Sequence, residues 1–167
     1  MTITLTALAS ITGTQTKTFE GQSPSMSIDF SESHALTDGV TTSKADLIWV
    51  DKDRVLNATT EEIDLSGTLT DAFGDAVVFA KVNGIYIHNK QVTAGETLKV
   101  GGAAANAFLL FDNATDIYTI GPDGVFFLSE PSLAGKAVSA ATGDLLKLDA
   151  GATANLTFDI VIWGRSA

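Results

Sequence analysis

Residues 63–89 read IDLSGTLTDAFGDAVVFAKVNGIYIHN, and this stretch decides the fold. Apolar residues fall on even positions from Val78 to Val82, and after Gly84 they move to odd positions at Ile85 and Ile87. A period-2 pattern that slips by one residue at a glycine indicates a β-bulge, because one extra residue exchanges the two faces of a strand. The stretch therefore predicts a long bent strand at the centre of an antiparallel sheet that packs on a second sheet.

The rest of the chain adds short strands separated by turn signals. Gly121-Pro-Asp-Gly124 between two apolar runs is typical of a hairpin, because Pro presets φ and Gly accepts a positive φ. The last strand has the clearest alternation, with five apolar residues predicted on its core face: Ala154, Leu156, Phe158, Ile160 and Ile162.

About ten short strands with almost no helix favour a sandwich or a closed barrel. The long separation between the central and the last strand favours a Greek-key arrangement. We therefore predict an all-β, antiparallel, jelly-roll-like β-sandwich. Residues 103–107 are the one helix candidate, and residues 108–111 form either a strand buried on both faces or a loop that plugs the core.

The N-terminal part has a weaker core pattern than the rest. Residues 2–7 alternate as a half-buried strand, and residues 25–30 place Met26, Ile28 and Phe30 on one face. Residues 11–19 are rich in Thr and Gln and could form an edge strand or an extended arm. We expect an N-terminal β segment or arm over residues 1–44, partly packed on the core, and the jelly-roll-like domain over residues 45–167.

Composition narrows the possible partners. The formal net charge of −10 argues against binding to nucleic acid phosphates or to an anionic lipid surface. The absence of cysteine excludes disulfides and thiolate chemistry, and no apolar run is long enough to cross a bilayer. The first residues lack the basic and apolar regions of a signal peptide. We expect no nucleic acid or membrane partner.

No catalytic, metal or cofactor site is expected. His34 and His88 are far apart and have no acidic partner at ligand spacing. The acidic loops at 71–75 and 112–116 carry oxygen ligands that Ca²⁺ accepts, but turn chemistry also explains them. No nucleophile elbow or phosphate loop occurs. The protein is therefore predicted not to be an enzyme.

Adjacent aromatic residues give the candidate interaction surface. A strand must point Phe126 and Phe127 to opposite faces, and the outer face of the last strand turns apolar at Val161 and Trp163. Exposed aromatic and apolar patches mark subunit or ligand contacts. Together with Tyr86 on the central strand, the candidate surface comprises Tyr86, Phe127, Val161 and Trp163. The alternative is that loops or the N-terminal segment cover these side chains.

The run ADLIWVDKDRVLNATTEEIDLSGTLTDAFGDAVVFAKVNGIYIHN resembles small virion structural proteins of tailed bacteriophages. The resemblance continues through LKVGGAAANAF, IGPDGVFFLSEPSLAGKAV and TGDLLKLDAGATANLTFDIVIWGRSA, and it covers residues 45–167. It implies a jelly-roll-like, non-enzymatic protein that decorates or cements the capsid. The implied partner is the shell of the major capsid protein, which the protein would bind as a homo-oligomer, trimer or dimer. The implied location is the capsid surface, after assembly in the host cytoplasm.

Two further hypotheses accompany this resemblance. Residues 2–19 would suit an arm that reaches neighbouring shell subunits. The alternative function is a carbohydrate- or receptor-binding module of a phage tail component, in which an exposed Tyr86 or Trp163 would stack on sugar rings.

Overall fold

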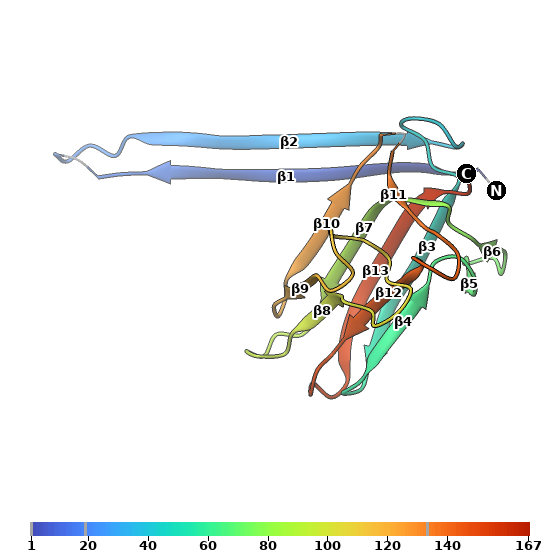
Figure 1. The fold of residues 1–167 in the computed structure, drawn as a ribbon. Coiled ribbons are helices and arrows are strands. Elements are labelled where there is room, and N and C mark those ends of the chain that lie inside the picture. The colour runs from blue at the N-terminus through green and yellow to red at the C-terminus, as the bar shows by residue number, and fades with distance from the viewer. Residues whose placement is uncertain (1, 19, 133) are drawn as a thin grey trace.

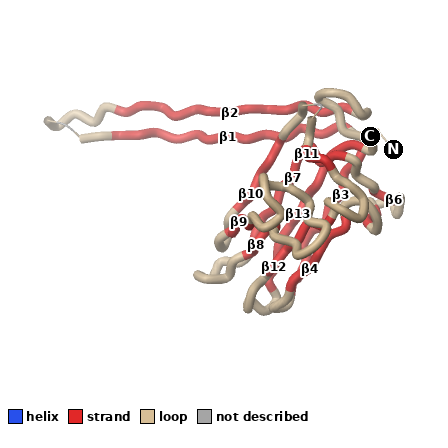
Figure 2. Tube along the Cα trace, in the orientation of Figure 1, coloured by secondary structure: helices blue, strands red, loops and turns tan. Residues whose placement is uncertain are grey.

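The computed structural model describes residues 2–18, 20–132 and 134–167. Over these residues the chain is all-β, with thirteen strands and no helix. Two antiparallel sheets pack as a β-sandwich, which confirms the predicted fold class, and a long two-stranded hairpin is attached to one side (Figure 1). Figure 2 shows the same arrangement with the strands in red and the loops in tan.

The first sheet of the sandwich has five strands. Along its main path the order is β10-β7-β13-β3, and the short β11 pairs with β7 beyond the end of β10. The strands span Leu47–Leu56 (β3), Lys81–Asn89 (β7), Val125–Ser129 (β10), Lys136–Ala137 (β11) and Leu156–Arg165 (β13).

The second sheet has four strands in the order β4-β12-β8-β9. They span Thr60–Asp64 (β4), Leu98–Gly101 (β8), Ile117–Ile120 (β9) and Leu145–Asp149 (β12). A separate two-stranded ribbon, Leu69–Thr70 (β5) and Ala76–Val77 (β6), lies in the connection between β4 and β7.

The core lies between the two sheets. Strand β13 contributes four fully buried side chains in strict alternation, as its sequence predicts. The second sheet contributes alternate residues of β8 and β12, which are also fully buried. Each such side chain adds roughly 1.5–3 kcal/mol by leaving water. Ala154, predicted on the same core face, is exposed because β13 begins only after it. The four β13 residues are Leu156, Phe158, Ile160 and Ile162.

The predicted slip in the central strand is present in the pairing of β7 with β13. Trp163 pairs with Gly84 and Gly164 pairs with Val82, so Asn83 is the extra residue. Ile85 and Ile87 are fully buried, as predicted. The prediction for Val78 was wrong: this residue is exposed because strand β7 starts at Lys81 and the preceding chain follows a different path.

Two other expectations resolve in the loop after β8. Residues 103–107 do not form a helical turn, because Asn106 has a positive φ of 51° and its carbonyl accepts hydrogen bonds from the backbone of Asp144 and Leu145. Residues 108–111 are a loop and not a strand. Phe108 and Leu110 are buried while Leu109 is exposed, so this loop plugs the core.

The N-terminal hairpin is built from β1 (Thr4–Thr16) and β2 (Ser25–Thr37). The two strands pair antiparallel without interruption from Thr4 opposite Thr37 to Thr16 opposite Ser25. The base of the hairpin lies on the first sheet, and the rest of the hairpin projects past β10 (Figure 1). Every described residue from 8 to 33 is exposed except Ile28, which is half-buried.

Candidate interaction surface

The outer face of the first sheet carries the base of the hairpin. Ala7 and Leu36 of the hairpin pack with Trp163 and Ala45 in a second, smaller apolar cluster outside the sandwich core. At the β10 edge, Nδ1 of His34 lies 2.9 Å from the Ser129 hydroxyl oxygen. The base of the hairpin is therefore fixed to the body by both apolar and polar contacts.

Trp163 does not belong to the exposed surface that its sequence position suggested. Only 3% of the residue is accessible, because the hairpin base covers it. The indole also lies across Gly84 of the neighbouring strand, where the missing side chain leaves it room. The alternative in which the N-terminal segment covers these aromatic residues applies to Trp163.

The other three predicted residues form one row beside the hairpin. Phe127 pairs with Tyr86, and Tyr86 pairs with Val161, so all three side chains lie on the same outer face. The register adds Val50, which pairs with Val161. Phe127 is 36% and Val50 48% exposed, whereas Tyr86 and Val161 are half-buried. We call the row Phe127, Tyr86, Val161 and Val50 the outer stripe.

Sequence reasoning missed Val50, although a signal for it existed. The run ADLIWV places Leu47 and Trp49 on the core face of β3, and the residues between them must then face outward. The structure agrees, since Ile48 and Val50 are the outer-face partners of Trp163 and Val161. Residues on the second face of a strand are as predictable as those on the first.

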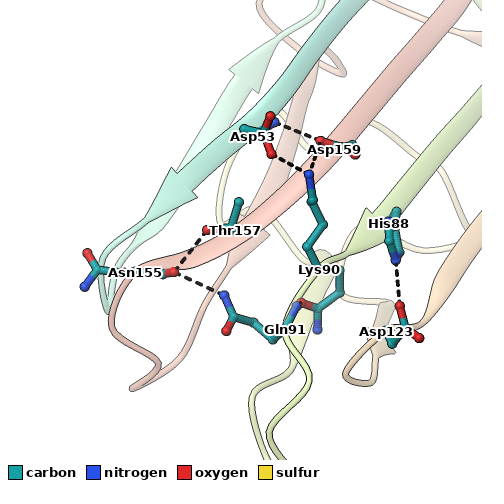
Figure 3. Close-up of polar contacts among 9 residues, drawn as sticks. Asp53, His88, Lys90, Gln91, Asp123, Asn155, Thr157 and Asp159 are labelled. Atoms are coloured by element: carbon teal, nitrogen blue, oxygen red, sulfur yellow. Dashed lines mark hydrogen bonds and ion pairs between the residues drawn. The ribbon is translucent and has the colours of Figure 1, made fainter.

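A polar band bounds the outer stripe on the side away from the hairpin, because His88 and Asp159 pair two residues beyond Tyr86 and Val161. Figure 3 shows the polar contacts of this band. The Lys90 ammonium forms an ion pair with Asp53 and lies 3.6 Å from a carboxylate oxygen of Asp159. Lys90 lowers the pKa of Asp53 through this hydrogen bond and its charge. Next to it, Nε2 of His88 lies 3.1 Å from an Asp123 carboxylate oxygen. The outer stripe is thus an apolar row between the hairpin and a charged band.

The part of the hairpin that projects beyond the body comprises the described residues from 8 to 33, and we call it the arm. The arm has two different faces. Odd positions of β1 lie beside even positions of β2, so one face combines Ile11 with Phe30, Gly13 with Ile28 and Gln15 with Met26. Ile11 is 68%, Phe30 69% and Met26 58% exposed. We call Ile11, Met26, Ile28 and Phe30 the arm face.

The opposite face of the arm is mostly Ser and Thr, with Leu8 and Asp29 as exposed exceptions. At the base of the hairpin, the side that carries the arm face is the side that packs on the body, through Leu5, Ala7 and Leu36. A shallow cavity of about 310 Å³ opens where the arm leaves the body, between Glu32 and Phe127. Beyond Ala9 and Glu32 on this side, the large apolar residues Ile11, Met26 and Phe30 of the arm face are exposed.

The sequence predicts only part of this arm. The pattern of residues 25–30 predicts Met26, Ile28 and Phe30 on one face, as the structure shows, whereas residues 11–19 are compatible with an edge strand or an arm. The structure continues β1 to Thr16 and pairs it fully with β2. Phe19 lies outside the described residues.

The candidate metal residues have local structural roles. The Asp71 carboxylate accepts hydrogen bonds from the backbone N–H groups of Phe73 and Asp75, and the Asp116 carboxylate accepts one from Asn113. Among the residues that the structure describes, no three His, Cys, Asp or Glu side chains gather at one place. In the same part of the chain, no helix has the length and apolar character needed to span a membrane.

The cavity beside residues 103–107 also carries little chemistry. It has a volume of about 490 Å³ and is lined mainly by alanines of residues 103–107, with Ser139 and Thr142 as its hydroxyl groups.

Comparisons of the chain with protein-family models, curated proteins and solved structures found no match. The outer stripe and the arm face are therefore the features from which function is inferred.

Proposed function

We propose that this protein is a non-enzymatic structural protein of a tailed-phage virion. In this proposal it is a capsid decoration or cement protein that binds the outer shell of the major capsid protein and bridges its subunits. The observation that carries the proposal is the arm, a paired projection whose large apolar residues Ile11, Met26 and Phe30 are exposed within the described part of the chain.

The energetics of the arm support a role in assembly. An isolated two-stranded hairpin is at best marginally stable in water, and exposed apolar side chains on it gain nothing from burial. Phe30 and Ile11 nevertheless lie directly opposite each other in solvent. Contiguous exposed apolar side chains mark contacts with other molecules. A body with an arm also suits bridging, because two linked contacts bind more tightly than either contact alone.

The strand order of the body supports the same proposal. Taken along the chain, β3, β7, β10 and β13 lie in the first sheet, while β4, β8, β9 and β12 lie in the second. We infer a jelly-roll-like arrangement, since this interleaving is what two Greek keys folded together produce. Jelly rolls occur in viral capsid and lectin domains, and the resemblance of residues 45–167 to virion proteins favours the capsid.

The arm is a two-stranded unit, which changes how its role must be tested. Removing residues 2–19 alone would leave β2 without its partner and expose a long strand edge. A shortened hairpin, in which residues 10–31 are replaced by a two-residue turn, keeps the base paired and docked. This variant separates loss of the arm from loss of the fold.

Co-sedimentation with phage shells that lack this protein tests the proposed function. We expect saturable binding in a fixed ratio to the capsid subunits, and greater resistance of the decorated shells to heat. Shells that already carry the protein are the control and should take up no more of it. Absence of binding to the undecorated shells, with a folded protein, would overturn the proposal.

The carbohydrate-binding alternative loses one of its two stacking residues. Trp163 is covered by the hairpin base, so a sugar ring could stack on it only if the hairpin left the sheet. Tyr86 is half-buried within the outer stripe. We therefore do not favour this function, and unchanged tryptophan fluorescence across a glycan panel is the expected result.

A further inference from the structure

The hairpin already makes one contact of a kind that it could make again. At its base, Leu5, Ala7 and Leu36 pack on the outer face of the first sheet around Trp163 and Ile48. The arm face lies on the same side of the same hairpin and has the same apolar character. The hairpin therefore carries apolar residues at its base, which the body covers, and again at the arm face, which the body leaves exposed. Ala9 and Glu32 lie between these two groups on the same side.

The sheet likewise offers more apolar surface than the hairpin covers. The outer stripe is the next row of side chains after the covered row, as Val161 and Trp163 are two residues apart on β13. Its end residues, Phe127 on β10 and Val50 on β3, are among the exposed large apolar residues. The outer stripe is thus exposed at its two ends, while Tyr86 and Val161 between them are half-buried against the hairpin-base cluster. Each copy of the protein carries this partly open apolar row and an exposed arm face.

We propose that the arm of one copy packs its apolar face on the outer stripe of a second copy. Each copy would give one arm and accept one, and in the proposed assembly the contacts close into a dimer or a small ring and do not continue as a filament. The inference rests on the proposed function for its biological setting and deepens it by naming the partner of the arm. Copies linked in this way would hold neighbouring shell subunits together, because each copy of the oligomer would bind a different subunit.

The dimensions of the two surfaces match. The outer stripe crosses four neighbouring strands, which at about 4.8 Å per spacing makes a row of roughly 14 Å. The arm face extends over four residue steps, from Ile11 to Gln15, which at about 3.3 Å each makes roughly 13 Å. An arm lying along the stripe would run beside the hairpin of the accepting copy, which crosses the same sheet face in Figure 1.

Charge favours an apolar and not an ionic contact between the copies. None of the eight residues of the arm face and the outer stripe is charged. Two copies with a net charge of −10 each repel one another, and salt screens this repulsion. Self-association should therefore become stronger as the salt concentration rises, whereas a contact held by ion pairs would become weaker.

Sedimentation velocity on three single variants of the full chain tests the contact. Phe30→Asp places a charge on the arm face, and Val50→Asp places one on the outer stripe. Leu8→Asp is the matched control, because Leu8 is exposed to a similar degree but lies on the Ser/Thr face of the hairpin. Circular dichroism checks that all three variants fold. We expect that they do, because the three replaced side chains are exposed.

We expect the wild-type protein and Leu8→Asp to form the same small oligomer. Phe30→Asp and Val50→Asp should each weaken it by about tenfold or more, since burial of an unpaired charge is unfavourable. A mixture of the two defective variants should form a one-to-one heterodimer, because the intact arm of Val50→Asp can still bind the intact stripe of Phe30→Asp.

A wild-type protein that stays monomeric at all salt concentrations would overturn this inference. So would a mixture of the two defective variants that associates no more strongly than either variant alone, or a loss of the oligomer in Leu8→Asp as large as in Phe30→Asp. The proposed function fails separately, by absence of binding to shells. A monomer that still binds shells through its arm would retain the function and assign the arm to the capsid subunits.

Discussion

Gly84 and Trp163 are partners across β7 and β13, and a Cβ atom on Gly84 would lie 1.9 Å from Cζ2 of Trp163. The indole occupies the space that any other residue at position 84 would fill. Its far side is covered by Ala7 and Leu36 of the hairpin base. The glycine beside the bulge in the central strand therefore also leaves room for the Trp163 ring, on which the hairpin base packs.

Replacement of Gly84 by Ala should destabilise the protein by about 1–3 kcal/mol, because the added methyl group forces the Trp163 ring out of its place. Urea unfolding of the variant measures this change. In a Trp163→Ala background the same substitution should have a much smaller effect, since the clash is gone. Equal effects in the two backgrounds would show that the ring does not govern the choice of glycine.

Leu36→Ala should loosen the hairpin more than the sandwich. Leu36 is 1% exposed, yet its apolar neighbours belong to the contact between hairpin and outer face and not to the main core. We expect a loss of about 2 kcal/mol, at the low end for a buried leucine. Hydrogen exchange should accelerate in β1 and β2 and stay unchanged in β13. Uniform acceleration across all strands would contradict the local character of this contact.

Asn89→Asp should be strongly destabilising at neutral pH. The fully buried Asn89 side chain donates hydrogen bonds to the backbone carbonyls of Glu96, Ile120 and Gly121 and accepts one from Gln91. A carboxylate would face three carbonyl oxygens without a proton to donate, at a cost of about 3 kcal/mol or more.

The pH dependence of the Asn89→Asp variant gives a second reading. Burial raises the folded-state pKa of the new carboxyl group, so the protonated form is favoured in the folded protein. The loss of stability relative to the wild-type protein should be small in acid. It should grow as the pH rises above the pKa of the carboxyl group in the unfolded chain, about 3.9. Asn57→Asp, at an exposed position, is the control and should stay within about 0.5 kcal/mol of wild type.

Lys90→Met should raise the pKa of Asp53 toward its ordinary value of 3.8, because Lys90 is the main cause of its lowering. A carboxyl group with a lowered folded pKa contributes stability above its unfolded pKa and loses it as the pH falls through the folded pKa. The variant should therefore differ from wild type near neutral pH and converge with it in strong acid. A carbon-detected titration of Asp53 measures the shift. Lys52→Met, which removes a weaker charge effect, should move this pKa less.

The sandwich is the part that the sequence predicts well, because its strands have one buried and one open face. The alternation of β13 and the phase change at Gly84 follow directly from burial on one side of each strand. The placement of Tyr86, Phe127 and Val161 on one outer face follows from the same rule.

The arm is harder to predict for the same physical reason. Residues 8–16 contact no core, so burial imposes no apolar pattern on them, and their two large apolar residues, Leu8 and Ile11, point to opposite faces among small and polar residues. The partnership of Ile11 with Phe30 depends on the pairing of β1 with β2, which residue types alone do not specify. Trp163 was misplaced because its cover comes from the other end of the chain.

The position of β13 has a consequence for the order in which the protein can be completed during translation. This last strand lies between β7 and β3, and it also carries Trp163 for the hairpin base. On the ribosome the hairpin can pair early, since its two strands are neighbours in the chain. Its docking site does not exist until β13, which is synthesised after β3 and β7, has entered the sheet between them. The direction in which the arm points is therefore fixed only when the sheet closes around β13.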